Sequence, residues 1–498
     1  MSLSSSNLTA GFIDLATYDE LEKYMYGGAD ATAYFVRETR KATWFTQVPV
    51  VLSRQSGTPD FGQQASWNIS RAGDYLLNTW LRVTVPQLLV NSAGVALAAQ
   101  QGVMWTRNLM HNLVSQVSIS FNDLVAQSFN SQHLDFWAAF TVPASKRVGY
   151  DNMIGNLAFL TNPAQCNLTP VVAPPVPGST FAAVNPNVGP LGGTVLNLPL
   201  PLFYTRDSGV ALPTAALPYN DMKLTVDFRT VAQLVCQIFS AGGGLTQVGA
   251  VGAVLGGTPL VAPTLVGGGL PALTNVEMWA TYAIVSNQER KRMACAPRDI
   301  LIEQVQIFNN TQFLAAQANA VNNYDIRFSQ AIKLLFFGVV NATSGLGAEN
   351  TMCNRSNYTS RQPVLAGTVI QRGLGQDPVN TTTLFYENTV RLAAMGSDYF
   401  SLVCPYYTAP TIPDITGFHL YSYSLDFICL DPLGSTNYGK LTNISLRLTA
   451  SADAANSVLG PAGVPPTQAF ANTFLFVASA INNNIIRISG GALGFPVL

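Results

Sequence analysis

The chain has 498 residues, of which 48% are hydrophobic and only 11% are charged, and its net charge is -1. This length is enough for several domains with large cores, but the charged fraction is far below the roughly 25% of typical soluble domains. Few charges and a near-zero net charge favour association with other chains. The densest basic run, residues 290–292, is too short for a nucleic-acid-binding surface, which needs clustered Lys and Arg.

The beginning of the chain carries no basic segment followed by an apolar core, so we expect no secretory signal. Two long uncharged stretches, 152–205 and 230–276, are interrupted by Pro and Gly. We interpret them as loops or short strands, because a helix in lipid tolerates few such breaks. The six cysteines include no C-x-x-C pair, so we expect mostly reduced thiols and no zinc site.

The first element that the sequence predicts is a short helix over residues 18–26. Thr17 and Glu20 fit a capping box, and Gly27 with Gly28 ends the helix. Its apolar residues fall on one face at helical spacing: Tyr18, Leu21 and Met25. So small a stripe needs a surface to lie against, and we predict that it is the packing face of an N-terminal arm.

Period-two alternation then dominates and predicts antiparallel strands. In the first series the core positions are Val117, Ile119, Phe121, Met222, Leu224, Val226, Phe228, Val276, Met278, Ala280, Tyr282 and Ile284. In the second series they are Val305, Ile307, Tyr324, Ile326, Phe328, Tyr421, Tyr423, Leu425, Phe427, Ile444, Leu446, Leu448, Phe474, Phe476 and Ala478. Helical periodicity is scarce, which fits sandwiches or jelly rolls better than an α/β fold with crossover helices.

The two series predict an all-β protein made of two tandem eight-stranded sandwiches, a double jelly roll. The expected parts are an arm (1–42), a first jelly roll (43–286), a linker (287–298) and a second jelly roll (299–498). Long connections of little charge interrupt the strands, at 87–112, 152–193, 232–273 and 341–387. Loops of this length are typical of interaction surfaces.

A series of short motifs runs in order along almost the whole chain: GFIDLATYD (11–19), MYGG (25–28), ATAYFVR (31–37), WFT (44–46), FGQQ (61–64), RAGDYL (71–76), GYDNMIG (149–155), LPLFYTRDSG (200–209), ERKRM (289–293), LIEQ (301–304), YSYSL (421–425), GSTN (434–437) and RISGG (487–491). In these motifs the chain resembles the major capsid proteins of nucleocytoplasmic large DNA viruses, most closely those of iridoviruses. The stretches near 170–190 and 242–269 depart from the family's pattern, so details of the outer surface are not carried over.

The resemblance implies a double jelly roll that forms homotrimers. These would be pseudo-hexagonal capsomers that tile the icosahedral outer shell of a virion assembled in the host cytoplasm. The implied partners are neighbouring capsomers and the minor capsid and penton proteins. We expect no direct nucleic-acid binding, and contact with an internal viral membrane only indirectly or through the base of the capsomer. The long connections would then gather on the outer face, and the arm would face the interior.

No motif supports catalysis, a metal or a cofactor. The segment 434–440 fits G-x-x-x-x-G-K, but Leu441 stands where a phosphate loop needs Ser or Thr, and predicted strands flank it. The three histidines, His111, His133 and His419, lie far apart, and we interpret them as structural. Two rival functions remain at this stage. A secreted β-sandwich adhesin would need the secretory signal that we do not expect, and a glycosidase would need two carboxylates beside a sugar cleft, although acidic residues are sparse here.

Sequons are frequent in the chain, and four of them fall in one predicted loop: Asn341, Asn354, Asn357 and Asn380. If any sugar is attached, we expect it in this loop.

Overall fold

The computed structural model forms two compact units, Met1–Trp44 and Phe45–Leu498. The residues that it describes are 3–37, 39, 41–86, 88–89, 91–92, 95–96, 101–157, 160, 194–241, 244–250, 254–255, 258–259, 264–265, 271–295, 297–342, 355–360, 377–459 and 473–495. None of the described helices is long and apolar enough to cross a membrane.

The first unit contains two helices, α1 (Leu3–Ala16) and α2 (Glu20–Met25). The predicted helix is therefore present, but its cap was misplaced by two residues. Asp19 is the N-cap, and it exchanges hydrogen bonds with Glu22, each side chain accepting from the other's backbone N–H. Thr17 instead bonds back to the last turn of α1, a helix that the sequence analysis missed.

Residues 45–285, the N-terminal half of the second unit, form two antiparallel sheets. The first has the order β1-β18-β4-β11, from the strands β1 (Phe45–Val51), β4 (Tyr75–Val85), β11 (Thr194–Pro199) and β18 (Thr274–Val285). The second has the order β10-β9-β12-β3-β2, from the strands β2 (Ser53–Ser56), β3 (Gln64–Asn68), β9 (Val114–Phe121), β10 (Leu124–Asn130) and β12 (Met222–Phe228).

Residues 298–494, the C-terminal half, form the corresponding pair of sheets. The first has the order β19-β28-β22-β25, from the strands β19 (Arg298–Ile307), β22 (Ala331–Asn341), β25 (Phe418–Ser422) and β28 (Phe474–Ser489). Three short strands extend it: β20 (Thr311–Phe313), β26 (Thr436–Asn437) and β29 (Ala492–Gly494). The second has the order β21-β27-β23-β24, from the strands β21 (Val321–Asp325), β23 (Val379–Tyr386), β24 (Thr389–Gly396) and β27 (Ile444–Ala450).

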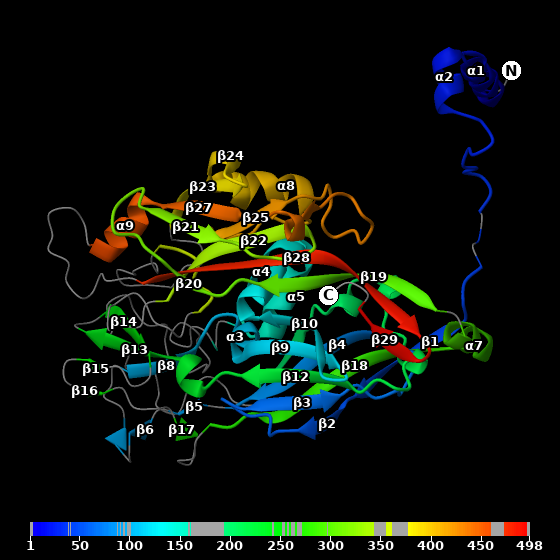
Figure 1. Ribbon diagram of the computed structural model, residues 1–498. Coiled ribbons are helices and arrows are strands. Elements are labelled where there is room, and N and C mark those ends of the chain that lie inside the picture. The colour runs from blue at the N-terminus through cyan, green and yellow to red at the C-terminus, as the bar shows by residue number, and fades with distance from the viewer. Residues whose placement is uncertain are drawn as a thin grey trace. The chain divides into compact units, whose positions relative to one another are not determined.

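The two halves have the same topology. When the edge strand β2 and the short strands β20, β26 and β29 are left out, the two sheets of each half contain eight strands; counted in chain order, one sheet is 1-8-3-6 and the other is 5-4-7-2. This is the arrangement of a jelly roll, in which strands distant in sequence pair across two facing sheets. Figure 1 shows the two sandwiches one above the other, with the helix α4 (Ser131–Thr141) between them. The predicted double jelly roll is therefore confirmed.

The long connections of the N-terminal half carry small sheets of their own. In the described residues the connection 87–112 contains β5 (Leu88–Leu89), β6 (Asn91–Ser92), β7 (Val95–Ala96), β8 (Gln101–Trp105) and the helix α3 (Leu109–Leu113). The connection 232–273 contains β13 (Val235–Ala241), β14 (Gly244–Ala250), β15 (Val254–Leu255), β16 (Thr258–Pro259) and β17 (Thr264–Leu265). Most of 152–193 and of 341–387 lies outside the described residues.

Other helices lie between the strands. They are α5 (Ala144–Ile154), α7 (Asn287–Cys295), α8 (Cys404–Thr408), α9 (Ala452–Leu459) and the π-helical turn η6 (Tyr399–Val403). The helix α7 occupies most of the expected linker 287–298. Because residues 45–498 form one compact unit, the domain boundary at this linker stays a prediction.

The predicted strand faces are mostly correct. In β12 the residues Met222, Leu224, Val226 and Phe228 are all buried, and β9 and β27 alternate as expected. The phase fails at the end of β18, where Ala283 is buried and Ile284 is exposed; just before this point the pairing of β18 with β4 shifts in register, between Thr281 and Tyr282. The strand predicted from Tyr421 also ends early, at Ser422.

Beyond that end, Leu425 is exposed in an irregular segment, and Phe427 is buried by packing against α4 rather than by strand phase.

Candidate functional site

The joint between the two halves is built around α4, which belongs to the N-terminal half but fills a core of the C-terminal half. Asn130 caps this helix by accepting a hydrogen bond from the backbone N–H of His133. Phe136 and Phe140 then stack on Phe336 of β22, with ring centroids 5.8 and 5.5 Å apart. Burial of each ring contributes about 1.5–3 kcal/mol, so α4 fastens one sandwich to the other.

A buried charge cluster lies in the same joint. Glu303 of β19 accepts from Lys333 Nζ at 2.6 Å and from Arg206 Nε at 2.8 Å. The Lys333 and Glu303 side chains are each 2% exposed, and the Arg206 guanidinium lies 4.0 Å from the centre of the Trp137 ring. One carboxylate thus joins cations from both halves, because Arg206 precedes the linker and Lys333 follows it.

His133 lies beside this cluster, between aromatic rings. Its Nδ1 is 3.1 Å from the Ser479 hydroxyl, and its ring stacks on Trp137. Burial, together with the positive charge of Arg206, lowers the pKa of His133 to about 3. The imidazole is therefore neutral at ordinary pH, as expected of a structural histidine.

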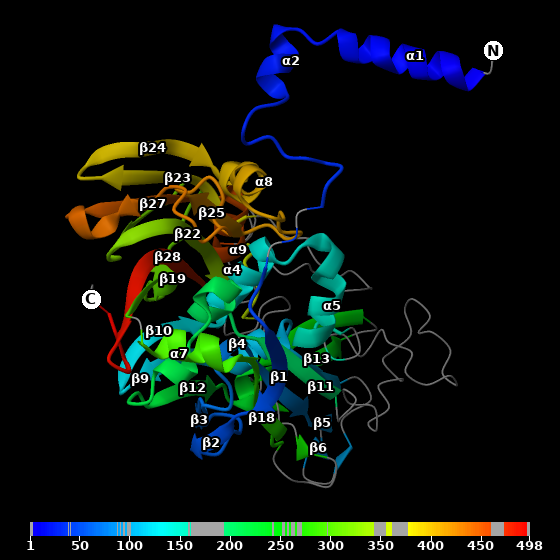
Figure 2. The ribbon, with the colours of Figure 1, turned by 90° about the vertical axis from the view of Figure 1, so that its right-hand side faces the viewer.

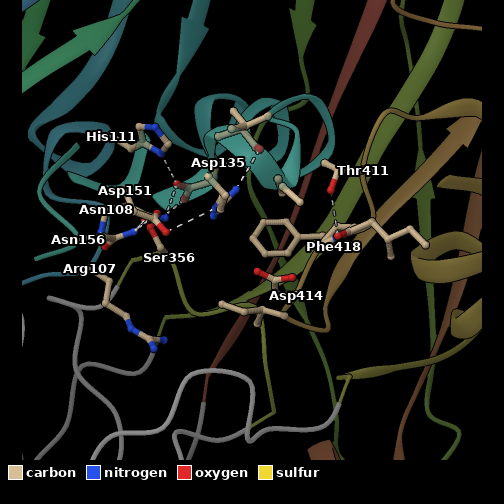
Figure 3. Close-up of a pocket in the computed structure, with 18 of the residues that line it drawn as sticks. Arg107, Asn108, His111, Asp135, Asp151, Asn156, Ser356, Thr411, Asp414 and Phe418 are labelled. Atoms are coloured by element: carbon tan, nitrogen blue, oxygen red, sulfur yellow. Dashed lines mark hydrogen bonds and ion pairs between the residues drawn. The ribbon is translucent and has the colours of Figure 1, made fainter. Parts of the chain in front are cut away.

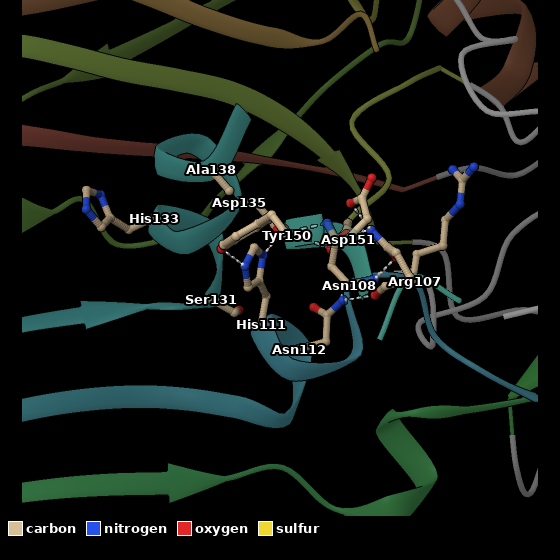
Figure 4. A network of polar contacts seen from close by, with 12 residues as sticks. Arg107, Asn108, His111, Asn112, Ser131, His133, Asp135, Ala138, Tyr150 and Asp151 are labelled. Atoms are coloured by element: carbon tan, nitrogen blue, oxygen red, sulfur yellow. Dashed lines mark hydrogen bonds and ion pairs between the residues drawn. The ribbon is translucent and has the colours of Figure 1, made fainter. Parts of the chain in front are cut away.

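A second polar network surrounds Asp135, on the opposite side of α4 (Figure 4). Asp135 Oδ1 is 2.7 Å from His111 Nδ1, and His111 Nε2 is 2.7 Å from the Tyr150 hydroxyl. The other carboxylate oxygen accepts from Ser356 Oγ at 2.8 Å. The network links α3, α4 and α5 of the N-terminal half to the segment 355–360 of the C-terminal half.

This network does not have the geometry of a catalytic triad. Ser356 donates to the carboxylate rather than to the imidazole, so His111 is not positioned to take the proton of this hydroxyl. The second nitrogen of His111 faces Tyr150, and burial with the nearby Asp135 charge raises the pKa of that phenol. The arrangement satisfies buried polar groups, which is what a rigid joint requires.

A cavity of about 350 Å³ adjoins the network (Figure 3). Its lining mixes both charge signs with apolar groups: Arg107, Asp135, Arg147, Asp151, Ser356, Asp414 and Phe418. In the described part of the chain no three His, Cys, Asp or Glu side chains gather in a group that could hold a metal ion.

The segment that imitates a phosphate loop is a turn. Thr436 and Asn437 form β26, and residues 438–440 form one 3-10 turn in place of the α-helix that a phosphate loop precedes. The Asn437 side chain accepts from the backbone N–H of Gly439, and Tyr438 is buried. His419, the third histidine, is buried with Nε2 2.7 Å from Asp377 Oδ2.

The four sequons do not share one exposed loop. Asn341 ends β22 and Asn357 lies in the segment 355–360, and these two residues are buried, 4% and 9% exposed. Asn380 is exposed in β23 and donates to Asn319 at 2.8 Å. Asn354 lies outside the described residues.

The arm residues Tyr18, Leu21 and Met25 are 50%, 64% and 54% exposed. Among the described cysteines whose side chains are placed, Cys404 and Cys429 are free thiols.

The sequence analysis missed the residues that build the joint. Asn130 followed by eleven residues without Pro or Gly was a usable signal for α4. The pairing of Glu303 with Arg206 had no local signal, because the two residues are 97 positions apart.

Two family models match the chain. "Large eukaryotic DNA virus major capsid protein" matches residues 289–494, and "Major capsid protein N-terminus" matches residues 33–285. Among curated proteins, the major capsid protein of Costelytra zealandica iridescent virus is 53% identical over 500 residues, and that of Invertebrate iridescent virus 6 is 54% identical over 508 residues. Both matches cover 100% of each chain.

Among solved structures, a chain of the quasi-atomic model of the PBCV-1 virus capsid superposes with a TM-score of 0.66 at 20% identity, covering 94% of this chain and 100% of that one. The Faustovirus major capsid protein superposes with a TM-score of 0.63 at 14% identity, covering 95% and 94%. At these identities the likeness concerns the fold alone.

Proposed function

Because this chain belongs to the family of major capsid proteins of large eukaryotic DNA viruses, we propose that three copies assemble into one pseudo-hexagonal capsomer. The chain is a structural protein of the virion capsid and not an enzyme, so the adhesin and glycosidase alternatives are dropped. The repeated 1-8-3-6 and 5-4-7-2 topology carries the proposal. Three chains with two like sandwiches each supply six similar walls, and one repeated contact can close the ring.

Native mass spectrometry of the purified chain tests this stoichiometry. We expect the main species at three times the chain mass of 53.3 kDa. A monomer or a dimer at every concentration would contradict the trimer.

Around the trimer we propose the remaining architecture. Residues 43–286 and 299–498 are the two walls, and residues 287–298 connect them. Capsomers tile the icosahedral shell in the host cytoplasm, next to minor capsid and penton proteins, and reach an internal membrane only indirectly or through their base. The charged fraction of 11% supports these roles, since repeated lateral contacts between like surfaces are weakened by charge.

We place the arm, residues 1–42, at the base of the capsomer. The exposure of Leu21 and Met25 in α2, and of Tyr18 just before this helix, supports this, because a helix as short as α2 is marginal alone and its apolar residues need a partner. That partner is the jelly-roll underside or a minor capsid protein. The long connections 87–112, 152–193, 232–273 and 341–387 then gather on the outer face.

Limited proteolysis of intact virions tests this orientation. The first cuts should fall in the long connections, while residues 1–28 survive until the shell opens. Early loss of residues 1–28 from sealed particles would invert the orientation.

A further inference from the structure

The equal topology of the two halves gives each element of one half a counterpart in the other. After the β9–β10 hairpin comes α4, and after the β23–β24 hairpin come η6 and α8. Likewise, the sheet β1-β18-β4-β11 corresponds strand for strand to the sheet β19-β28-β22-β25. Where an element of one half packs on an element of the other half, their two counterparts therefore form a second pair of surfaces of the same kind.

One such contact lies inside the chain. The helix α4 covers the outer face of the sheet β19-β28-β22-β25, where Phe136 and Phe140 meet Phe336 and where buried neighbours such as Leu420 and Ile481 complete the cluster. Beside it β10 lies against β19, and Gln304 Nε2 donates to the carbonyl oxygen of Ala126 at 2.7 Å. In this joint α4 and β10 of the N-terminal half thus cover the sheet β19-β28-β22-β25 of the C-terminal half.

Among the residues that the structure describes, nothing covers the helical counterpart in this way. In η6 and α8 the side chains of Leu402, Val403, Tyr406 and Tyr407 are 50%, 43%, 69% and 76% exposed. Their spacing places them on one face, and residues 399–408 carry no charge. Figures 1 and 2 both show α8 on the side of the C-terminal half that is turned away from the N-terminal half.

In the described part of the chain the sheet counterpart is covered near β11, where α3 and α5 pack, and the rest of its outer face is open. On the outer face of β1-β18-β4-β11, Trp80 and Trp279 stack with ring centroids 6.0 Å apart, and both remain partly exposed. Their neighbours across the adjacent strands are Val51, paired with Trp279, and Pro199, paired with Trp80. A mostly apolar groove of about 950 Å³ begins at Trp80 and runs beneath α5. In β1, six of the seven residues are exposed, whereas its counterpart β19 is covered by β10.

We propose that the η6–α8 face of one copy packs on the Trp80–Trp279 face of the next copy, as α4 packs within the chain, with β24 beside β1. This contact rests on the proposed trimer and assigns its surfaces. The occupant is a second copy because the internal joint uses the same two kinds of element. Because the contact uses two different surfaces of the chain, it is a head-to-tail contact. Such contacts close into a ring when the rotation from each copy to the next brings the last copy back to the first.

Site-specific photo-crosslinking tests the contact without disturbing the fold. Tyr407 is replaced by benzoyl-phenylalanine, and light and heavy-nitrogen chains are assembled together and irradiated. We expect mixed-label crosslinks from position 407 to peptides that contain Trp80 or Trp279. An intact trimer with crosslinks only to other peptides would overturn this contact and leave the trimer standing. A chain that never oligomerises would overturn both.

A pair of matched variants gives a second readout. Val403→Asp places a charge in the proposed contact, while Val321→Asp does so on β21, at the far edge of the sheet from β24. Both valines are exposed, at 43% and 57%. With unchanged circular dichroism, Val403→Asp should shift the trimer to monomer and Val321→Asp should not. Trimers of equal stability from both folded variants would refute the proposal.

Discussion

At the scale of single residues, Glu303 holds the joint between the two halves. It is the carboxylate shared by the buried cations Lys333 and Arg206, so its removal leaves two positive charges in a water-poor site. Unpairing a buried charge is strongly destabilising, although an intact buried pair adds little net stability.

We therefore predict that Glu303→Gln lowers the free energy of unfolding by about 3–5 kcal/mol. The control is Asp123→Asn, which removes the 92% exposed partner of Lys223 and should cost less than about 1 kcal/mol. Urea denaturation of the two variants measures the difference. Equal, small effects would show that the cluster does not hold the joint.

His133 should make stability depend on pH. Its pKa is lowered from 6.5 to about 3 by burial and by Arg206. Between these two pH values the imidazole is therefore protonated in the unfolded chain but not in the folded chain. The contribution of the neutral imidazole is complete above pH 6.5 and is lost as the pH falls toward 3. The loss is about 1.4 kcal/mol per pH unit within that window.

Replacement of His133 by Gln should remove this dependence. The unfolding free energies of the wild type and His133→Gln are compared at pH 7 and pH 5. The wild type should lose about 2 kcal/mol more than the variant between these values. Parallel pH profiles would mean that His133 is not held neutral by the fold.

The sequence predicted structural roles for the histidines but not their partners. His111 meets Asp135 and Tyr150 only because three helices converge, and these residues are 24 and 39 positions away. Local pattern carries no information on such convergence. The burial of Asn341 and Asn357 has no local signal either, because a backbone hydrogen bond pairs their two separate segments.

At the scale of elements, alternation succeeded where a strand has one core face and no irregularity. It failed at the end of β18, where Ile284 is exposed close to a register shift in the pairing with β4. The helix α4 was missed because it is buried against both halves, so it lacks a polar face and a clean helical period. The capping box of α2 was predicted two residues too early, because both Thr17 and Asp19 are suitable N-cap residues and Asp19 takes this role in the structure.

The phase of β12 gives a direct test at this scale. Val226 is fully buried between β3 and β9, so Val226→Asp should abolish soluble oligomer, because an unpaired buried charge costs several kcal/mol, on the order of 3–5. The adjacent Thr225→Asp faces the other side of the sheet and should remain soluble. Wild-type yield from Val226→Asp, measured by size-exclusion chromatography, would contradict the assigned core face.

At the scale of the whole molecule, the doubled series of strands was sufficient to predict two like sandwiches. It could not predict how they join, because the joint is made by α4, Glu303 and the Asp135 network rather than by the strand pattern. The repeated topology of the two halves is the basis on which a ring of six walls is proposed, and the α4 contact is the pattern for the proposed contact between copies.

Negative-stain electron microscopy of the purified chain tests the central claim most directly. Class averages should show particles with threefold symmetry and a pseudo-hexagonal outline, since three chains contribute six like sandwiches. Elongated or compact monomers under conditions in which the chain is folded would contradict the account.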